Sequence, residues 1–278
     1  MVEKYMPQII NGKVIAARVE HACKDMIESF AIKPKLVVIT TEEADPASKI
    51  YMRNKQRAAE RIGILYEEII LNKYADQTIM LSTIRRLNVD KSVHGIIVQL
   101  PLPARFDVQE IQEEIDPAKD VDGFHPQSYF DPCTPDAVIA MLCSEGFDLD
   151  GKHCVVIGRS DIVGKPLARM LLAQNATVTQ CHSHPPPEQL AMLCKTADYI
   201  FCAAGVPGLL RPEYLSYGQS VVVDISINRD IEGKLCGDMH PDAVAMTAAY
   251  TPVPGGVGPL TVSRLMWHTV QAALETRD

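Results

Sequence analysis

A tyrosine and a lysine lie four positions apart in the segment DPASKIYMRNKQRAAERIG, residues 45–63. If this segment is helical, Tyr51 and Lys55 are neighbours on one face, because residues four apart lie one above the other. A lysine in such a place can exchange a proton with a bound molecule or with water. It can equally pack its apolar stem against the tyrosine and keep its charge in water. Both roles remain open at this point.

The segment carries its own helix signals. Asp45 is a good N-cap, Pro46 suits the first helical position, and Gly63 favours the left-handed conformation that ends a helix. Steps of three and four residues then form one face from Ser48, Tyr51, Lys55, Ala59 and Ile62. The other face is polar and consists of Lys49, Arg53, Gln56, Arg57 and Glu60. Lys55 is therefore predicted to lie apart from the water-facing cations.

A second chemical signal lies later in the chain, in VVIGRSDIVGKPLARMLLAQ. It is typical of a strand, a glycine turn and a helix, the setting in which backbone N–H groups bind a phosphate. Ser160 stands where the GxGxxG fingerprint has its middle glycine, so a simple tight turn at Gly158 remains an alternative. The next strand ends in QCHSH and offers no acid for a ribose hydroxyl, whereas Arg159 lies in the turn itself. A phosphorylated ribose is favoured, which predicts NADP over NAD.

The order of the Tyr/Lys pair and the glycine turn along the chain distinguishes between classes of dehydrogenase. Short-chain dehydrogenases also carry a tyrosine four residues before a lysine, but their glycine turn opens the chain and the pair follows in the same domain. Here Lys55 precedes Gly158. The pair and the nucleotide turn are therefore predicted to belong to two domains that face one cleft.

The remaining sequence predicts the elements that position these residues. Short apolar runs rich in β-branched residues alternate with amphipathic helical stretches, which is typical of parallel sheets covered by helices on both faces. The predicted strands are residues 35–40, 94–100, 153–158, 176–181, 198–204 and 220–226. The fold class is therefore α/β, with two domains of parallel-type sheets around a cleft, the second of them Rossmann-like.

Two helices mark the domain boundaries. A helix over 134–146 is predicted with Thr134 as N-cap, Pro135 at the first position and Gly146 at the end. A last helix, over 260–275, follows the segment TPVPGGVGPLT and could pack back onto the first half. The predicted domains are residues 1–139 plus 258–278 and residues 140–257.

Composition narrows the class of protein. The chain has 278 residues, enough for two domains, and a net charge of −8, which disfavours nucleic acid as a partner. Its eight cysteines form no CxxC pair and several lie in apolar runs, so they are predicted to be reduced thiols in the cytosol. CHSH at 181–184 lacks a second ligand cluster, so no zinc site is expected. No signal peptide or membrane-spanning run is recognised, so a soluble, cytoplasmic protein is expected.

Seven motifs together resemble one family. In chain order they are YMRNK, VQLPLP, KDVDGFHP, PCTP, GRSDIVGKP, CHS and TPVPGGVGPLT. The sequence resembles the bifunctional methylenetetrahydrofolate dehydrogenase/methenyltetrahydrofolate cyclohydrolase family. The resemblance implies a two-domain α/β homodimer in one-carbon folate metabolism. It also implies oxidation of methylene-tetrahydrofolate with NADP, followed by hydrolysis of the methenyl product to formyl-tetrahydrofolate.

The resemblance assigns roles to residues. The family's active lysine falls on Lys55, its partner tyrosine on Tyr51, its glutamine on Gln99 and its pterin-binding aspartate on Asp122. The implied substrate-binding positions are Tyr51, Gln99, Leu100, Pro101, Asp122, Pro254, Gly255 and Gly256. The implied dinucleotide contacts are Gly158, Arg159, Ser160, Ser183 and Ile227. No metal ligand is implied.

The residue types suit these roles. Gln99 is predicted to end a buried strand, where its amide can hold the lysine by a hydrogen bond. Asp122 can accept two parallel N–H bonds from a pterin, or can simply form a turn before Gly123. The glycines of PVPGGVGP let the backbone approach a flat ring, or make the segment a rigid linker.

The sequence departs from the family pattern in three places. The approach to the first helix reads VITTEEADPAS where many members have a VGDDPAS-like segment, and Ser226 stands in DISIN where glycine is usual. His184 stands where many members have a basic residue, which weakens a second cationic contact to the ribose phosphate.

Two other classes fit the sequence less well. A shikimate-type dehydrogenase would share the two-domain cleft but has no reason to carry VQLPLP together with KDVDG. A non-catalytic folate-binding protein would tolerate the loss of Lys55, and the lysine is present.

Overall fold

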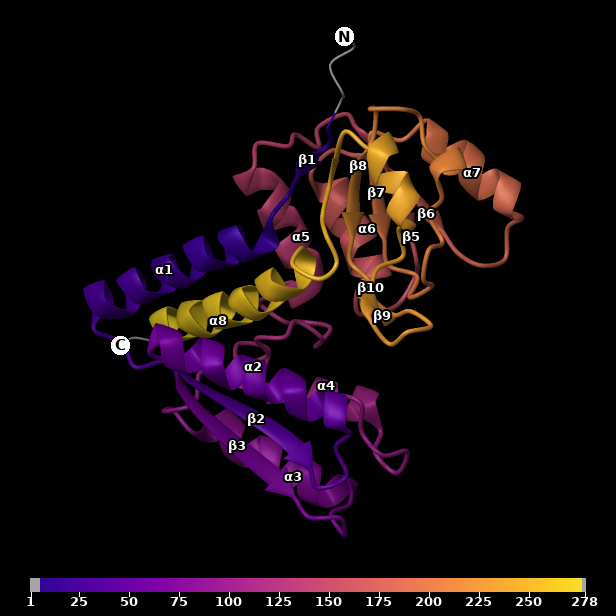
Figure 1. Ribbon diagram of the computed structural model, residues 1–278. Coiled ribbons are helices and arrows are strands. Elements are labelled where there is room, and N and C mark those ends of the chain that lie inside the picture. Colours follow the sequence, from indigo (N-terminus) through magenta and orange to yellow (C-terminus); the bar gives the residue numbers. More distant parts are fainter. Residues whose placement is uncertain (1–5, 277–278) are drawn as a thin grey trace. The chain divides into compact units, whose positions relative to one another are not determined.

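The computed structural model describes residues 6–276 and places every predicted strand in one of two parallel sheets (Figure 1). Contacts between residues divide the chain into two compact units. Unit 1 comprises residues 134–261 and the segment that ends at Ala16, and unit 2 comprises residues 17–133 and those from 262 onward. Helices α1 (Gly12–Phe30) and α8 (Val257–Glu275) each run from one unit into the other.

Unit 2 is built on a three-stranded sheet in the order β3-β2-β4. The strands are β2 (Lys35–Thr41), β3 (Leu65–Leu71) and β4 (Gly95–Val98). The helices between them are α2 (Pro46–Ile62), α3 (Gln77–Val89) and α4 (Val108–Glu114). The α/β prediction is therefore confirmed for this half of the chain.

Alternate residues of β2 explain why this sheet has helices on both faces. Leu36 and Val38 pack into a cluster with residues of α1, α2 and α8, whereas Val37 and Ile39 pack into a cluster with residues of α3 and α4. All four side chains are fully buried. Successive side chains of a strand point to opposite faces, so a continuous apolar run requires a cover on each side.

Strand β3 is absent from the strands predicted by sequence. It lies at the edge of the sheet, pairs with β2, and carries Glu67 and Glu68 in its centre. Most of its residues are exposed or half-buried, so the segment lacks the continuous apolar run on which the prediction depended.

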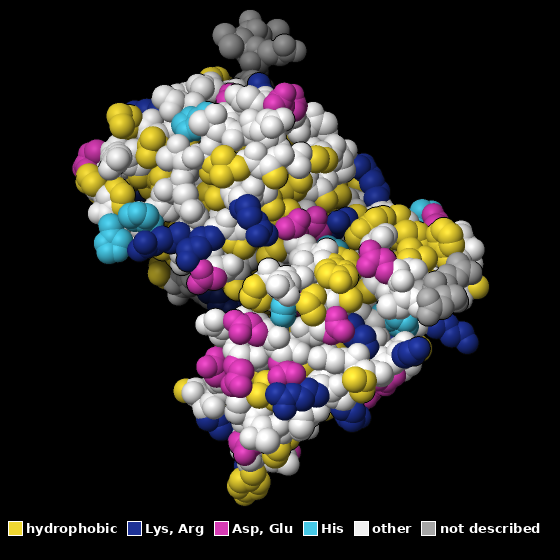
Figure 2. Space-filling model, turned by 180° about the vertical axis from the view of Figure 1, so that it is seen from behind, with side chains coloured by type: hydrophobic (Ala, Val, Ile, Leu, Met, Phe, Trp, Pro, Cys, Tyr) yellow, Lys and Arg dark blue, Asp and Glu magenta, His cyan; other side chains and the backbone are white. Residues whose placement is uncertain are grey.

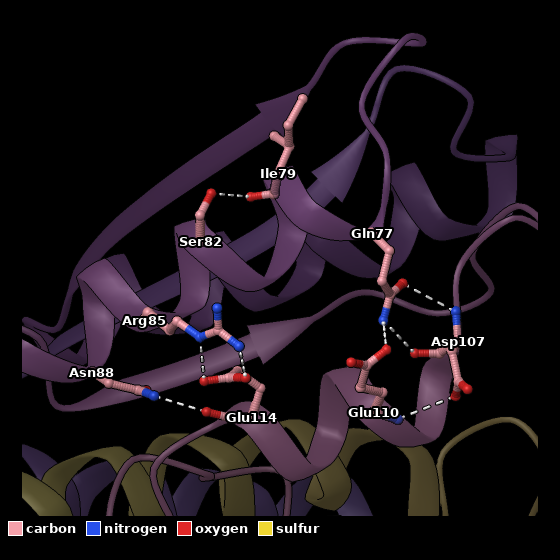
Figure 3. Close-up of polar contacts among 8 residues, drawn as sticks. All are labelled: Gln77, Ile79, Ser82, Arg85, Asn88, Asp107, Glu110 and Glu114. Carbon is pink, nitrogen blue, oxygen red and sulfur yellow. Dashed lines mark hydrogen bonds and ion pairs between the residues drawn. The ribbon is translucent and has the colours of Figure 1, made fainter.

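Polar contacts fasten α3 to α4 (Figure 3). Arg85 forms a two-pronged ion pair with Glu114, at 2.9 and 2.8 Å, and Asn88 Nδ2 donates to the Glu114 carbonyl at 2.8 Å. At the other end of α4, Gln77 Nε2 donates to Glu110 Oε2 at 2.8 Å, and the Asp107 N–H donates to Gln77 Oε1 at 3.1 Å. These contacts fix the segment that leads from α4 toward Asp122.

Unit 1 is built on a six-stranded parallel sheet in the order β1-β11-β8-β7-β5-β6. The strands are β1 (Gln8–Ile9), β5 (His153–Ile157), β6 (Thr177–Cys181), β7 (Tyr199–Cys202), β8 (Val221–Asp224) and β11 (Ala249–Tyr250). The α-helices are α5 (Cys133–Ser144), α6 (Gly164–Ala173) and α7 (Pro187–Lys195). An antiparallel pair, β9 (Asn228–Arg229) with β10 (Leu235–Cys236), follows β8, and two short 3₁₀ helices span Pro212–Tyr214 and Pro241–Met246.

Two predicted helices begin earlier than expected. Helix α5 begins at Cys133, so Thr134 and Pro135 lie inside its first turn, and α8 begins at Val257 instead of 260. Proline is tolerated throughout a first turn because the N–H groups there have no partner within the helix. The predicted end of α5 is confirmed, since Gly146 has a φ of 77° and Phe147 N–H donates to the Leu142 carbonyl at 3.0 Å.

All eight cysteines lie in the described part of the chain and carry thiols. Six of them are buried, and burial raises the pKa of Cys23, Cys154 and Cys194 to about 12. Such thiols stay protonated at neutral pH and act as small apolar side chains. None of the helices described is long and apolar enough to cross a membrane.

Candidate active site

Helix α2 presents the predicted lysine. Asp45 caps it by accepting the Ser48 N–H at 2.8 Å, and Gly63 ends it with a φ of 94°, as the sequence predicts. Lys55 is half-buried, while Tyr51, one turn earlier, is 46% exposed. The five residues of the polar face are all exposed, as predicted, and Ser48, Ala59 and Ile62 of the other face are buried. Tyr51, which is predicted to share that second face, is exposed.

Lys55 contacts Gln99, which lies directly after β4. Lys55 Nζ donates to Gln99 Oε1 at 3.1 Å, across 44 residues of sequence. Gln99 is buried, and its Nε2 donates to the Leu100 carbonyl at 2.7 Å, which fixes the orientation of the amide. The Ser48 hydroxyl donates to the same carbonyl at 3.3 Å and so ties α2 to the chain after β4. Pro101 follows through a cis peptide bond and is exposed.

The loop that carries Asp122 is held from several sides. Its buried neighbour Asp120 accepts the His125 N–H at 2.7 Å, and burial raises the pKa of the Asp120 carboxyl. Lys119, also buried, donates to the carbonyls of Leu87 and Asp90 at 2.9 and 2.7 Å, at the end of α3. Burial lowers the pKa of this lysine. Both charged neighbours of Asp122 in the KDVDG motif therefore have structural contacts.

Asp122 itself is half-buried and borders a small pocket. The pocket is lined by residues of β4 and α4 and by Leu100, Ile115, Asp120, Asp122 and Phe124. Gly123 makes the turn after Asp122 with a φ of 79°, and a Cβ there would lie 2.5 Å from the Asp131 carbonyl. The turn predicted as the alternative role of Asp122 is thus present, and Asp122 also lines a pocket.

Two residues that sequence reasoning missed hold the backbone next to Asp122. Cys133 Sγ donates to the Val121 carbonyl at 3.2 Å, and His268 Nδ1 lies 2.9 Å from the same oxygen. Phe130 stacks on the His268 ring with 4.9 Å between ring centroids. No local motif signals this contact, because His268 lies in the last helix.

The predicted substrate residues of the loop before α8 lie in unit 1. Pro254 is exposed, Gly255 is buried with a φ of 110°, and Gly256 is buried. A Cβ on Gly12 would lie 1.7 Å from the Gly256 carbonyl oxygen, so α1 begins in tight contact with this loop. A Cβ on Gly256 would lie 2.7 Å from the Pro252 carbonyl oxygen, so packing requires that glycine, whereas Gly255 is favoured by its positive φ.

The predicted nucleotide turn has the expected form of strand, turn and helix. Gly158 ends β5 with a φ of 132°, and a Cβ there would lie 2.2 Å from the Ala203 carbonyl oxygen. Ser160 Oγ accepts the N–H groups of Val163 and Gly164 at 3.2 and 3.3 Å, at the start of α6. Arg159 and Ser160 are exposed.

The other predicted dinucleotide residues follow neighbouring strands. Ser183 comes after β6 and Ile227 after β8, and both are exposed. Because these strands are parallel to β5 in one sheet, their carboxyl ends share one edge, which is where open α/β sheets bind ligands. Gln180, in the strand whose end carries the ribose-binding acid of NAD enzymes, donates to the Gly158 carbonyl at 3.1 Å. The exposed turn over residues 159–162 before a helix start suits a dinucleotide phosphate.

Charges of both signs are mixed on the face of the molecule seen in Figure 2. Basic and acidic side chains are interspersed over the face seen in Figure 2, without the continuous basic surface that nucleic acids require. Among the residues described, no group of three or more metal-ligating side chains could hold a metal ion.

The parallel sheet with a glycine turn at a helix start defines unit 1 as a Rossmann-like dinucleotide-binding unit. Two family models match the chain, the "Tetrahydrofolate dehydrogenase/cyclohydrolase, catalytic domain" at residues 10–122 and the "NAD(P)-binding domain" of the same enzymes at residues 132–277. The chain belongs to the tetrahydrofolate dehydrogenase/cyclohydrolase family.

Individual relatives agree with this assignment over nearly the whole chain. The bifunctional protein FolD of Agathobacter rectalis is 43% identical over 96% of this chain and 99% of its own. The crystal structure of the bifunctional FolD enzyme from Campylobacter jejuni has a TM-score of 0.92 and 40% identity, over 96% of this chain and 99% of that one. A FolD structure from Trypanosoma brucei, complexed with NADP cofactor and an inhibitor, has a TM-score of 0.90 and 32% identity over 98% of both chains.

Proposed function

We propose that Lys55 transfers the proton in the hydrolytic reaction of this enzyme, with Gln99 holding it in place. The enzyme is bifunctional: it oxidises methylene-tetrahydrofolate to methenyl-tetrahydrofolate with NADP and hydrolyses the product to formyl-tetrahydrofolate. The observation that supports the role of Lys55 is the 3.1 Å hydrogen bond from its Nζ to Gln99 Oε1. That bond fixes a half-buried amine beside the chain after β4.

The two reactions place different demands on the residues. In the hydrolysis, water must lose a proton as it attacks and a ring nitrogen must gain one, so a positioned acid/base group is needed. In the oxidation, bound NADP would supply the hydride acceptor, and the residues of the protein would have only to align the substrate. Lys55 is therefore needed mainly for the hydrolysis.

We assign folate binding to residues around this lysine. The Asp122 carboxylate can accept two parallel N–H bonds from the amino-pyrimidine edge of a pterin. Its half-buried position beside the pocket supports this role, and Asp120 is already engaged by the loop. Tyr51 offers an exposed aromatic ring one turn from Lys55. Leu100, Pro101 and the Pro254–Gly256 loop complete the proposed substrate contacts.

The proposed division of labour follows the predicted domains. Residues 1–139 plus 258–278 would bind folate, together with the Pro254–Gly256 loop, and the rest of residues 140–257 would bind NADP through Gly158, Arg159, Ser160, Ser183 and Ile227. Because β1 pairs with β11, residues 8–9 belong to the sheet of the NADP-binding part. The folate-binding part would therefore begin after these residues.

We further propose a cytosolic homodimer. The eight thiols suit a reducing compartment. For the dimer, β3 is an edge strand on which Leu65 and Ile70 are 56% and 57% exposed, and such edges readily pair with another chain.

Replacing Lys55 by methionine tests the central proposal. The change keeps most of the apolar stem and removes the proton-transfer group, so cyclohydrolase activity should fall by about 10² to 10⁴-fold. Dehydrogenase activity should remain measurable, and methenyl-tetrahydrofolate should accumulate, which its absorbance reports. Lys49→Met, on the exposed face of the same helix, is the matched control and should leave both rates near those of the wild type. Hydrolysis by Lys55→Met at the wild-type rate would rule out Lys55 as the proton-transfer group.

A further inference from the structure

One carboxylate organises the sheet edge assigned to the cofactor. Asp238 is fully buried and accepts five hydrogen bonds. Its Oδ2 accepts from Ala204 N, Gly205 N and Ser226 Oγ at 2.8, 3.1 and 2.8 Å. Its Oδ1 accepts from Val206 N and Asn228 Nδ2 at 2.8 and 2.9 Å. Both carboxylate oxygens of Asp238 are thus bound by donors of the protein itself.

The donors come from two loops that follow neighbouring strands. Residues 204–206 follow β7, and Ser226 and Asn228 follow β8. Ile227 lies between those last two residues, so Asp238 holds the chain on both sides of a proposed cofactor contact. Ala203, just before the first loop, has its carbonyl oxygen 2.2 Å from an ideal Cβ on Gly158. The same carboxylate therefore fixes backbone beside two of the dinucleotide positions.

Asp238 is itself fixed by a second buried acid. Asp224 Oδ1 accepts the Asp238 N–H at 3.0 Å, and Asp224 Oδ2 accepts the Met239 N–H at 2.8 Å. A Cβ on Gly237 would lie 1.9 Å from Asp224 Oδ2, so the close approach requires glycine. The position of Asp238 is therefore set by β8, the strand whose following loop it holds.

The Ser226 hydroxyl adds a direct link between the two loops. It donates to Asp238 Oδ2 at 2.8 Å and accepts the Gly205 N–H at 3.1 Å. A glycine at this position, as the family pattern has, could make neither bond. Serine in place of glycine at residue 226 thus strengthens the connection between the loops after β7 and β8.

We infer that Asp238 and Ser226 are positioning residues for NADP, which hold the backbone around Ile227 and Gly205 in the conformation that binds the cofactor. This inference rests on the proposed cofactor site. Affinity depends on preorganisation, because a loop that is already ordered loses less conformational entropy when the ligand binds. Neither side chain needs to touch NADP for this effect.

The two activities of the enzyme allow a selective test. Hydrolysis of methenyl-tetrahydrofolate consumes no NADP and can be measured without it. NADP affinity can be measured separately, by calorimetric titration of the unmodified and variant enzymes. Ser226→Ala should weaken NADP binding by about three- to tenfold, and Asp238→Asn by about ten- to a hundredfold, since an amide offers one acceptor fewer to these donors. Cofactor-free cyclohydrolase activity should change less than twofold in Ser226→Ala.

Ser220→Ala is the matched control. Ser220 is fully buried at the other end of β8, and its hydroxyl donates to the Ala197 carbonyl before β7 at 2.7 Å. It therefore links the same two strands at their amino ends. Its loss should lower the melting temperature and leave NADP affinity unchanged.

Two outcomes would overturn the inference. The first is wild-type NADP affinity in Ser226→Ala, which stays informative even if Asp238→Asn fails to fold. The second is an equal loss of affinity in Ser220→Ala, which would indicate a general effect on the sheet. Arg159→Ala separates the inference from the proposed site: if Arg159→Ala loses NADP affinity and Ser226→Ala does not, only the inference fails.

Discussion

At the scale of single residues, Lys55 is held by a side chain without charge. The bond from Gln99 Nε2 to the Leu100 carbonyl directs Oε1 toward the lysine. An amide thus keeps the amine in place without the negative charge that a carboxylate would add beside it. Both partners come from regular elements, α2 and the end of β4, which position side chains more precisely than free loops do.

Arg159 belongs to the residue scale as well, because it is the exposed cation of the nucleotide turn. We expect Arg159→Ala to cost about 1.5 to 3 kcal/mol of NADP binding, the size of a hydrogen bond to a charged group. NAD lacks the ribose phosphate, so its affinity should change little. Titration of the variant with each cofactor measures this, and an equal loss for both would place Arg159 at the pyrophosphate or in the fold.

Asp224 makes stability depend on pH. Burial, with help from the Asp238 carboxylate, raises the pKa of Asp224 from 3.8 to about 7. The folded state therefore favours the protonated carboxyl, and the stability from this group is present below pH 3.8 and lost as pH rises to about 7. Between pH 5 and pH 8 the loss should be about 2 to 3 kcal/mol.

Urea unfolding of the wild type and Asp224→Asn at both pH values isolates this contribution. The asparagine stays neutral, so the free energy of unfolding of the variant, relative to the wild type, should rise by that amount toward pH 8. A difference that stays constant with pH would contradict the assignment of the titration to Asp224.

At the scale of elements, the contacts between α3 and α4 differ in strength although Figure 3 shows them side by side. The Arg85 side chain is 63% exposed, and water weakens an ion pair in such an exposed position. Asn88 is half-buried, donates to the Glu114 carbonyl at 2.8 Å and accepts the Asp116 N–H at 3.0 Å. Its loss leaves two backbone groups without these partners, in the segment that leads to Asp122.

We therefore expect Asn88→Ala to destabilise the protein by about 2 kcal/mol and Arg85→Ala to destabilise it less. Urea unfolding of both variants at moderate salt tests the order. Raising the salt concentration should reduce only the Arg85 effect. A larger cost for Arg85→Ala would show that the ion pair dominates this contact.

At the scale of the whole molecule, the last helix makes unit 2 discontinuous. Leu265, Met266 and Val270 of α8 pack in one cluster with Leu36 and Val38 of β2. The cover that β2 requires on this face thus comes partly from the end of the chain. This agrees with the prediction that the last helix packs back onto the first half of the chain.

The proposed dimer gives a prediction at this scale. If two chains associate through their β3 edges, Ile70→Lys should place a charge in the interface and shift the protein from dimer to monomer. Sedimentation measures the shift. Ile79→Lys, an exposed position on α3, is the control and should leave the oligomeric state unchanged. A dimer that survives Ile70→Lys would exclude the β3 edge as its interface.

The sequence by itself determined the local elements of this protein and the chemistry of its motifs. Asp45, Pro46 and Gly63 specify α2 because capping acts within a few residues. The buried strands could be predicted because an apolar run is also a pattern of neighbouring residues. The exposed edge strand β3 lacked that signal. Only the tertiary structure decided which distant residues meet, such as Lys55 with Gln99, His268 with Val121, and Asp238 with residues 204–206. These contacts depend on how strands and helices pack, and no spacing along the chain encodes them.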